Sequence, residues 1–475
     1  MPLPDLIEIL PLEKPVAASI SIPGSKSITN RALILAALAD GEVRLEGALW
    51  SEDTQAMVEC LRRLGFDVSV YPDPLEASNR LLAVKGLGGK IPMAGTEASP
   101  LELFVENAGT AARFLSAFVC LGKGVYRLSG IDRMHERPQA ALFVALRELG
   151  YRIESDTDKL PVTIHGSGPL PNECNVSINE SSQFASALLL CAQRGDWRVK
   201  INDQVDRGGN DASPAENSPY VAMTQELIGA FPKKGGTFQI EPDASSGSYF
   251  QAATWINNCL PGAGLAQLVK PDTQASAANQ PGDKARQIMT AHTRAKVSIA
   301  RWPTSSWQID AQFQKFRLYG LASDIREISR QTDLGDSILT AMILAPFASH
   351  PVRFTDLGRL RVQECERVAA MRTELSKCGV EVLEDGDTLT ICPSAQRLHG
   401  AEIETYNDHR IAMCFATLGL KVPGIKIKNP ACVKKTFPNF FQKLAAPPPD
   451  GLGVAIHDAT TSAARPLPAK QLFAD

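Results

Sequence analysis

Six similar segments recur along the 475-residue chain, and this repeat constrains the fold more than any other feature of the sequence. In each segment a short polar cluster precedes a stretch rich in alanine and other apolar residues, which is the pattern of an N-capped helix. The segments are marked by Lys26, Gly109, Ser182, Ser245, Ser337 and His409. Their spacing of roughly 75 residues predicts six copies of one supersecondary unit.

A second helix is predicted after three of the segments, each time at the same place within the repeat. The three copies of its apolar pattern begin at Val58, Phe143 and Met371. Each copy ends at a glycine that precedes another apolar stretch. A glycine at this point predicts a helix C-cap, because glycine adopts the left-handed conformation without steric strain. Each unit is therefore predicted to contain a strand, an apolar helix, a strand, an amphipathic helix and a further strand.

The first helix of each unit has almost no polar face, so other elements must enclose it. Three units with their helices inside and their sheets outside would do so, and six units make two such domains. The predicted fold class is therefore α/β (α+β), a two-domain inside-out α/β barrel of six repeated βαβαββ-like units, three in each domain. We assign residues 1–23 and 243–445 to domain I, residues 24–242 to domain II and residues 446–475 to a flexible tail.

Two stretches, 193–217 and 265–303, interrupt the repeat. They are rich in polar and turn-forming residues, so they are predicted to be surface insertions. The segment from Ala445 onward contains PPPDGLG and then many small residues, a composition typical of disordered or loosely docked chain.

The charge balance limits the classes of partner. The formal net charge is −3, which provides no general attraction to nucleic acid or to an anionic membrane. The sequence has no apolar run of about 18 residues and no signal-peptide pattern at its N-terminus. We therefore predict a cytoplasmic, monomeric protein with small-molecule partners and with neither nucleic-acid nor membrane binding.

The ten cysteines are scattered, with no C-x-x-C pair and no histidine at metal-binding spacing. Most have apolar neighbours, and a free cysteine packs as a small hydrophobic residue. We predict reduced core cysteines rather than disulfides or a zinc site.

The motif PGSKSITNR provides the clearest local signal for a binding site. It places Lys26, Ser27 and Arg31 in the first turns of a buried helix, where the helix dipole disfavours each cation by a few tenths to about 1 kcal/mol. A bound anion would remove this cost, because helix N-termini attract anions. Alternatively, the basic side chains extend to solvent or pair with carboxylates.

Further basic residues lie at or beside other helix starts, namely Arg113, Arg133, Arg137 and Arg410. Any one of them could form a structural ion pair, but together they predict convergence on polyanionic ligands. Ser181, Ser182 and Gln183 open the third apolar helix and add neutral donors suited to hydroxyls or phosphate oxygens. Ordinary N-capping would explain these three residues equally well.

Candidate proton-transfer groups occur in the second half of the chain. They are Asp336, Glu364 and His409, which follows Asp408. Asp336 and Asp408 could instead be helix caps, since a helix N-terminus stabilises an ionised carboxylate. If water is excluded above Asp336, its basicity would rise, as a base for an alcohol requires.

Taken together, these motifs resemble those of the EPSP synthase family of enolpyruvyl transferases, and they cover most of the chain. In the family's order they are PGSKSITNRALILAALA from Pro23, NAGTAARFL from Asn107, RMHERP from Arg133, SSQFASALL from Ser181, NDHRIAM from Asn407 and KKTFPNFF from Lys434. The family fold has two domains of three repeats that close like a clamp. This architecture agrees with the six units derived above.

The resemblance implies transfer of the carboxyvinyl group of phosphoenolpyruvate to the 5-hydroxyl of shikimate 3-phosphate, by addition and elimination, with no cofactor or metal. The implied shikimate 3-phosphate site is Lys26, Ser27, Arg31, Ser181, Ser182, Gln183, Tyr220, Asp336 and Gln363. The implied phosphoenolpyruvate site is Lys26, Asn107, Gly109, Arg137, Gln183, Arg367, Arg410 and Lys435. The implied catalytic residues are Lys26, the candidate base Asp336, and the candidate proton carriers Glu364 and His409.

Two positions depart from the family pattern. Gln363 stands where the family usually has lysine, and Asn217 stands where serine is expected. Glutamine cannot balance a phosphate charge, so a catalytically silent homologue that binds a phosphorylated metabolite is one alternative. The other is the relative that acts on UDP-N-acetylglucosamine, although IDRMHERP lacks the loop cysteine which that enzyme uses as an acid.

Overall fold

The strands of the protein form six sheets, as many as the predicted repeats, in a computed structural model that describes residues 3–202, 218–258, 296–319, 326–461 and 464–474. The apolar helices of the six units are α1 (Lys26–Leu38), α3 (Gly109–Phe118), α6 (Gln183–Gly195), α8 (Ala244–Asn258), α11 (Ile338–Leu344) and α13 (His409–Gly419). Every residue of α3 and α13 is buried, as is every residue of α1 from Ile28 onward. The prediction of enclosed helices is confirmed.

Three of the sheets share one topology, which establishes the internal repeat. Their strand orders are β12 (Gly236–Gln239)–β3 (Glu42–Leu49)–β5 (Asn79–Lys85)–β4 (Val68–Pro72), β6 (Leu101–Phe104)–β7 (Lys123–Ser129)–β9 (Val162–Ser167)–β8 (Arg152–Glu154), and β14 (Glu327–Ser329)–β15 (Val352–Thr355)–β17 (Thr388–Ile391)–β16 (Val382–Asp385). In each sheet the first pair is parallel and the other two pairs are antiparallel. The same arrangement of strands is therefore built three times, although β12 follows its sheet partners in sequence whereas β6 and β14 precede theirs.

The amphipathic helices between these strands end as the sequence predicts. They are α2 (Glu52–Arg63), α5 (Ala140–Glu148) and α12 (Arg367–Lys377). The glycine that follows each one, Gly65, Gly150 or Gly379, has a φ of 90°, 97° or 83°. Only glycine adopts this conformation without strain, and it turns the chain into the next strand.

The remaining sheets correct the prediction of two surface insertions. They are β10 (Asn172–Ser177)–β11 (Trp197–Asn202), β2 (Ala17–Ile20)–β13 (Lys296–Ile299) and β18 (Glu402–Ile403)–β19 (Ile425–Lys428)–β1 (Leu6–Ile9)–β20 (Ile456–Asp458)–β21 (Arg465–Pro466). Strands β11 and β13 lie inside 193–217 and 265–303. In β11 the side chains alternate between more buried and exposed, so its charged residues mark the outer face of a strand. The rest of both insertions falls largely outside the described residues.

The segment 446–475 is not a loose tail over its described residues. Strand β20 pairs with β1, and Leu452, Val454 and Leu472 are buried in the same core as β1. A few apolar side chains among proline and alanine are enough to anchor the segment. The overall composition of the segment gave no sign of these anchors.

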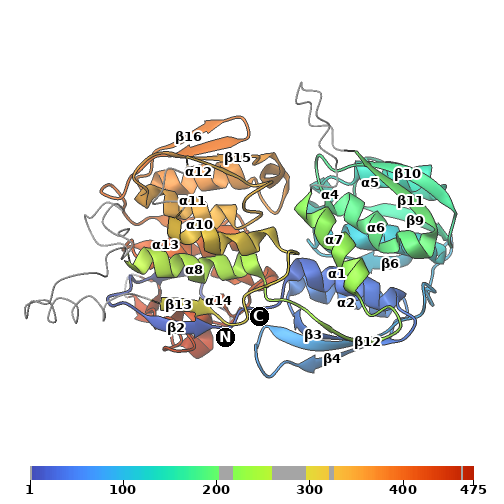
Figure 1. The fold of residues 1–475 in the computed structure, drawn as a ribbon, viewed down its shortest axis with the longest axis horizontal. Coiled ribbons are helices and arrows are strands. Elements are labelled where there is room, and N and C mark those ends of the chain that lie inside the picture. The colour runs from blue at the N-terminus through green and yellow to red at the C-terminus, as the bar shows by residue number, and fades with distance from the viewer. Residues whose placement is uncertain (1–2, 203–217, 259–295, 320–325, 462–463, 475) are drawn as a thin grey trace, which may run out of the picture.

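Two separate hydrophobic cores lie in the two lobes of Figure 1. One core draws its residues from between Ile28 and Ile240, and the other from Leu3 to Ile22 and from Tyr249 to Ala474. We call these lobes the N-terminal and C-terminal halves. In the C-terminal half, Figure 1 shows α8, α11, α12 and α13 stacked between β15 and β16 on one side and β2 and β13 on the other.

The smaller helices include α4 (Asp132–Glu136), α7 (Pro219–Ala230), α10 (Phe313–Tyr319) and α14 (Phe440–Ala445). None of the described helices combines the length and the hydropathy needed to cross a membrane. The nine described cysteines are all free, and seven of them are buried, as predicted. Cys259 lies outside the described residues.

Candidate active site

A pocket between the two halves contains most of the predicted site residues. Those that line it are Lys26, Ser27, Arg31, Gly109, Arg137, Ser181, Ser182, Gln183, Tyr220, Asp336, Gln363, Glu364, Arg367 and Arg410. Asn107, His409 and Lys435 lie just behind this lining and contact it or its neighbours. Asn217 falls outside the described residues. Residues more than 300 positions apart in sequence thus line one pocket.

The N-cap residues of the apolar helices in the N-terminal half do not cap them, contrary to our prediction. The N-cap residues Ser25, Ala108 and Ser182 make no side-chain cap hydrogen bond. Other side chains reach two of these helix starts, because the backbone nitrogen of Gln183 donates to Ser181 Oγ at 3.3 Å and that of Lys26 donates to Asp243 Oδ2 at 3.4 Å. The C-terminal half differs, because Asp408 accepts a hydrogen bond from the backbone nitrogen of Arg410 at 2.8 Å and so caps α13. The capping alternative is therefore confirmed for Asp408.

Three arginines of the N-terminal half donate to uncharged acceptors. Arg31 contacts Thr224 Oγ1 at 2.8 Å and Ser186 Oγ at 3.0 Å. Arg113 contacts Gln183 Oε1 at 2.7 Å, and Arg137 contacts the carbonyl of Asn107 at 3.0 Å. None of the three forms a salt bridge with a described carboxylate, so their charges are not neutralised within this part of the chain.

Burial makes these unpaired charges costly. It lowers the pKa of Arg31 to about 10 and that of Arg113 to about 9, because desolvation disfavours the charged form. The Nε atoms of Arg113 and Arg137 are buried and have no hydrogen-bond partner among the described residues. Both donors therefore have unused hydrogen-bonding capacity.

Gly109 allows two of these arginines to approach the start of α3. A Cβ atom at Gly109 would lie 2.6 Å from Arg137 Nη2 and 2.8 Å from Arg113 Nη1, too close for any side chain. A side chain at this position would displace the guanidinium groups of Arg113 and Arg137 from the helix start.

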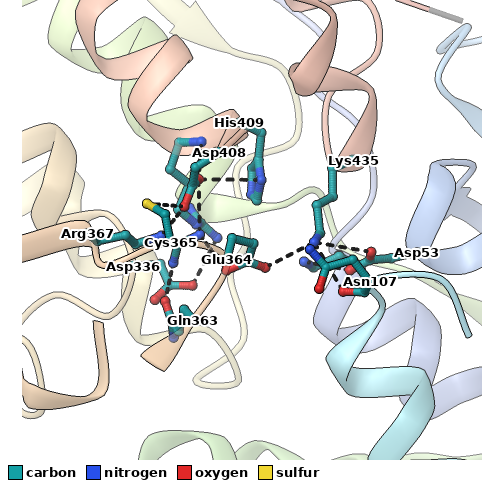
Figure 2. A network of polar contacts seen from close by, with 12 residues as sticks. Asp53, Asn107, Asp336, Gln363, Glu364, Cys365, Arg367, Asp408, His409 and Lys435 are labelled. Carbon is teal, nitrogen blue, oxygen red and sulfur yellow. Dashed lines mark hydrogen bonds and ion pairs between the residues drawn. The ribbon is translucent and has the colours of Figure 1, made fainter. Parts of the chain in front are cut away.

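Lys26 has a different environment from the three arginines. Its Nζ lies 3.0 Å from Asp53 Oδ2, which supports the alternative of a carboxylate partner for this residue. Lys435 of the 3₁₀ helix η7 (Pro430–Lys435) approaches from the other half and lies 3.9 Å from Asp53 and 3.6 Å from Glu364. Figure 2 shows this lysine between the two halves, where it also donates to the carbonyl of Asn107 at 3.2 Å.

In the C-terminal half the cations are paired. Arg367, which is 1% exposed, contacts Asp408 Oδ2 at 2.7 Å and Glu364 Oε2 at 2.8 Å. Burial alone would lower the pKa of Arg367, but Asp408 and Glu364 keep it above its ordinary value. Burial alone would raise the pKa of Glu364, but Arg367 and Lys435 hold it well below its usual range. Glu364 is therefore ionised.

Gln363 takes part in the same network (Figure 2). Its side-chain oxygen accepts a hydrogen bond from Arg367 Nη1. A lysine at this position could not accept that bond and would repel the guanidinium. The exchange of lysine for glutamine thus removes one cation and gives Arg367 a further acceptor.

His409 is 1% exposed and lies 3.7 Å from Asp408 Oδ1. Burial, followed by the nearby charges of Arg410 and Lys26, holds the pKa of His409 well below its ordinary value. Neither ring nitrogen has a hydrogen-bond partner among the described residues. The imidazole is therefore neutral and has unused hydrogen-bonding capacity.

In the substrate-free protein two arginines offset the effect of burial on Asp336. Its Oδ1 lies 3.0 Å from Arg330 Nη2 and its Oδ2 lies 3.0 Å from Arg410 Nη2. Burial would raise the pKa of Asp336, but Arg410 and Arg330 outweigh this effect and hold the pKa well below its usual range. It does not cap α11 either, because Asp310 instead accepts the backbone N–H of Ser337 at 2.6 Å.

Two arginines join the halves at the edge of the pocket. Arg133 of α4 donates to the carbonyls of Gln363 at 3.0 Å and Glu364 at 3.3 Å. Arg359 of η6 (Gly358–Val362) donates in the opposite direction, to the carbonyls of Ile178 at 2.6 Å and Asn179 at 3.2 Å. Each half thus donates to the backbone of the other, and the two halves are closed around the pocket.

Several charged residues of the pocket were missed by the sequence analysis. They are Asp53, Glu180, Asp243, Asp310, Arg330 and Arg359. Asp53 lies in the first turn of α2 and Asp243 lies directly before α8. Acidic residues are common at such positions, so the sequence carries no separate signal for a site there. In the described part of the chain, no cluster of three histidine, cysteine or acidic side chains is arranged to hold a metal.

Comparison with known proteins agrees with this architecture. Residues 12–444 match the family model of EPSP synthase (3-phosphoshikimate 1-carboxyvinyltransferase). The chain is 37% identical over 475 residues to the 3-phosphoshikimate 1-carboxyvinyltransferase of Opitutus terrae, covering 94% of this chain and 98% of that protein. It is 35% identical over 461 residues to the corresponding protein of Nostoc punctiforme, covering 92% and 98%.

The fold is also shared with a solved structure. The EPSP synthase of Acinetobacter baumannii superimposes with a TM-score of 0.62 at 20% identity, over 95% of this chain and 99% of that chain. The similarity extends over both halves. On these grounds the chain belongs to the EPSP synthase family.

Proposed function

We propose that the protein transfers the carboxyvinyl group of phosphoenolpyruvate to the 5-hydroxyl of shikimate 3-phosphate. The products are 5-enolpyruvylshikimate 3-phosphate and phosphate, a step of the shikimate pathway toward chorismate and the aromatic amino acids. Family membership supports this reaction. The structural observation that carries it is one closed pocket with unneutralised guanidinium groups on one wall and carboxylates on the other.

The N-terminal wall suits the two polyanionic substrates. The residues that would bind shikimate 3-phosphate, with its phosphate near the helix starts, are Lys26, Ser27, Arg31, Ser181, Ser182, Gln183 and Tyr220. Arg137, with Asn107 and Gly109, would bind phosphoenolpyruvate together with Arg367, Arg410 and Lys435 of the opposite wall. Charge-assisted hydrogen bonds to phosphate and carboxylate oxygens would neutralise the buried cations that lack partners.

The carboxylates and the imidazole would serve the chemical steps. Asp336 is ionised and faces the pocket, so it can accept a hydrogen bond from the reacting hydroxyl. Glu364 faces the same pocket, while His409 lies behind it, and one of these two would exchange the proton at C3 of phosphoenolpyruvate. The surrounding cations would stabilise charge that develops on the departing phosphate.

The test is release of phosphate by purified protein supplied with both substrates. We expect turnover that depends on shikimate 3-phosphate and on phosphoenolpyruvate, with no added metal. Calorimetric binding of either substrate without turnover would support the silent homologue and contradict the proposal. In that case Gln363→Lys shows whether the missing cation is responsible, since the variant restores the usual family residue.

We also propose that the enzyme acts as a monomer in the cytoplasm, as predicted from the sequence. The pocket is lined by the two halves of one chain, so the proposed reaction requires no second copy. Sedimentation at micromolar concentration with both substrates present would reveal any dimer, and a dimer required for turnover would contradict this assignment.

A further inference from the structure

Arg330 is a buried cation of the pocket that the proposed function leaves without a role. It lies in the loop between β14 and α11 and is 7% exposed. Its Nη2 contacts Asp336 Oδ1 at 3.0 Å, while Arg410 Nη2 contacts Asp336 Oδ2 at 3.0 Å. The Nε of Arg330 is buried and has no hydrogen-bond partner among the described residues. In the free protein each oxygen of Asp336 therefore has its own guanidinium partner.

Substrate binding would change this arrangement, because the proposed function assigns Arg410 to phosphoenolpyruvate. A bound anion that takes Arg410 leaves Arg330 in contact with Asp336. Two other arginines of the C-terminal half line the pocket, but both are engaged elsewhere. Arg359 donates to backbone carbonyls of the N-terminal half, and Arg367 pairs with two other carboxylates. In the loaded site Arg330 is therefore the cation that remains on Asp336.

We propose that Arg330 is a positioning residue, which holds Asp336 in place for shikimate 3-phosphate while Arg410 binds phosphoenolpyruvate. This inference rests on the proposed function and adds a residue that acts through Asp336. Asp336 Oδ1 stays with Arg330, and Oδ2, which Arg410 has released, accepts the reacting hydroxyl. A carboxylate oxygen can accept two hydrogen bonds, so Oδ1 also remains open to a hydroxyl of the substrate.

The backbone that carries Arg330 is fixed by contacts outside the pocket. The backbone N–H of Arg330 donates to the carbonyl of Thr355 on β15 at 3.1 Å. The turn that follows is closed on Ser329, whose carbonyl accepts the backbone N–H groups of Asp333 and Leu334, each at 3.1 Å. The backbone N–H of Ser329 in turn donates to Asp333 Oδ2 at 2.8 Å. A guanidinium on a backbone held in this way presents its donors in one geometry, as positioning requires.

The charges around Asp336 explain why one cation must stay. Burial raises the pKa of Asp336, but Arg410, followed by Arg330, outweighs burial and holds the pKa well below its usual range. Burial, followed by the charge of Asp336, raises the pKa of Asp310 to about 6, so the two carboxylates repel each other. Without a guanidinium in contact, Asp336 would bind a proton more readily and could no longer accept the hydroxyl.

The charged or titratable groups that face Asp336 are Arg330, Arg367, Arg410, Asp310 and Tyr220. Burial raises the pKa of the Tyr220 phenol well above its ordinary value, so this group is neutral. Loss of Arg330 from the loaded site thus leaves burial and Asp310 to raise the pKa of Asp336, with Arg367 opposing them from its own pairs.

Arg330→Gln tests the proposal, because glutamine keeps a polar side chain but removes the charge. We expect kcat to fall by about 100-fold, the scale expected when a reacting group is misplaced by about 1 Å. KM for phosphoenolpyruvate should stay near the wild-type value, since the cations assigned to that substrate remain. The acid-side decline of kcat should move to higher pH than in the wild type, because Asp336 then protonates more readily.

Arg330→Lys is the conservative variant. The contact with Asp336 is a single hydrogen bond from Nη2, so an ammonium can replace it and keep the charge. This variant should recover most of the lost rate and return the acid-side decline to its wild-type position. A purely structural role of Arg330 would change stability and leave the pH profile of kcat where it was.

Arg353→Gln is the matched control. Arg353 lies on β15, the strand that pairs with β14, and forms an exposed ion pair with Glu327 at 2.8 Å. Its kinetics should match the wild type. If Arg330→Gln keeps its kcat and its acid-side decline, the inference is wrong. A large rise in KM for shikimate 3-phosphate with kcat unchanged would also overturn it, because Arg330 would then bind the substrate directly.

Should the wild type release no phosphate, the proposed function fails, and a titration without substrates still tests Arg330. Arg410→Gln stands in for the state in which Arg410 has left Asp336. Carboxyl ¹³C titration should then give Asp336 a lower pKa in Arg410→Gln than in the protein that also carries Arg330→Gln. The Asp336 signal is the one lost on Asp336→Asn. Equal pKa values in the two proteins would overturn the inference.

Discussion

The two walls of the pocket carry similar cations in opposite electrostatic states. On the N-terminal wall Arg31, Arg113 and Arg137 donate to hydroxyls, an amide and carbonyls. On the C-terminal wall Arg330, Arg367 and Arg410 each contact a carboxylate within 3.0 Å. A buried charge without a partner is costly, and a suitable partner offsets part of that cost.

This difference suggests a division of labour between the halves. The three arginines of the N-terminal wall form no salt bridge with the described residues of the free protein, so substrate anions would supply their counter-charges. The C-terminal wall is neutralised before substrates arrive, which keeps its carboxylates ionised and in defined positions. Binding energy is therefore expected to come mainly from one half and proton transfer from the other.

The largest effect should come from removing a cation of the C-terminal wall that is paired with carboxylates. Arg367→Met leaves Asp408 and Glu364 without their buried partner, and loss of one member of a buried pair costs about 3–5 kcal/mol. We expect a decrease of that size in the free energy of unfolding, measured by urea denaturation. Arg353→Met, which removes an exposed pair with Glu327, is the control and should change stability little. Equal stability of both variants would mean that the pairing at Arg367 contributes nothing.

Removing a cation from the unpaired wall should affect function more than stability. Arg137→Met loses a donor to the substrate anion, and we expect kcat/KM for phosphoenolpyruvate to fall by about 10²–10³-fold, or roughly 3–4 kcal/mol. The free protein should unfold with nearly unchanged free energy, because no carboxylate is left unpaired. Arg127→Met, at an exposed pair with Glu102, is the control. A stability loss as large as that of Arg367→Met would show that the two walls do not differ.

The smallest effect is a change in stability with pH that differs between Asp310 and Asp336. The folded-state pKa of Asp310 is raised from 3.8 to about 6, so the folded protein binds a proton there that the unfolded chain releases. This contribution favours folding below about pH 4 and is lost as pH rises through 6. Asp310→Asn should therefore stabilise the free protein at pH 8 by about 3 kcal/mol, with no gain at pH 4.

The contribution of Asp336 to stability changes with pH in the opposite direction. Its folded-state pKa is lowered, so its contribution to stability is present above the unfolded pKa of about 4 and is lost as pH falls. Asp336→Asn should destabilise the protein at pH 8. Thermal unfolding of the two variants at both pH values measures these contributions, and shifts of the same sign would contradict the assignment.

Much of the fold could be predicted because its signals are local. The six apolar helices, the glycines after α2, α5 and α12, and the cations at the helix starts all follow from patterns shorter than about four turns. The errors arose where a short pattern was ambiguous. Strand β11 was mistaken for part of an insertion because every second residue is polar or charged, and the C-terminal segment was judged by its composition rather than by its few apolar anchors.

The sequence by itself determined the repeat, the enclosed helices and the set of basic residues at their starts, because helix periodicity and the helix dipole act over a few residues. Only the tertiary structure decided which of these cations have counter-charges. Arg410 reaches Asp336 and Arg367 reaches Asp408 across long stretches of chain, and Asp310 lies beside Asp336 without a cation of its own. Charge state depends on burial and on neighbours brought together by folding, and no local pattern encodes either of them.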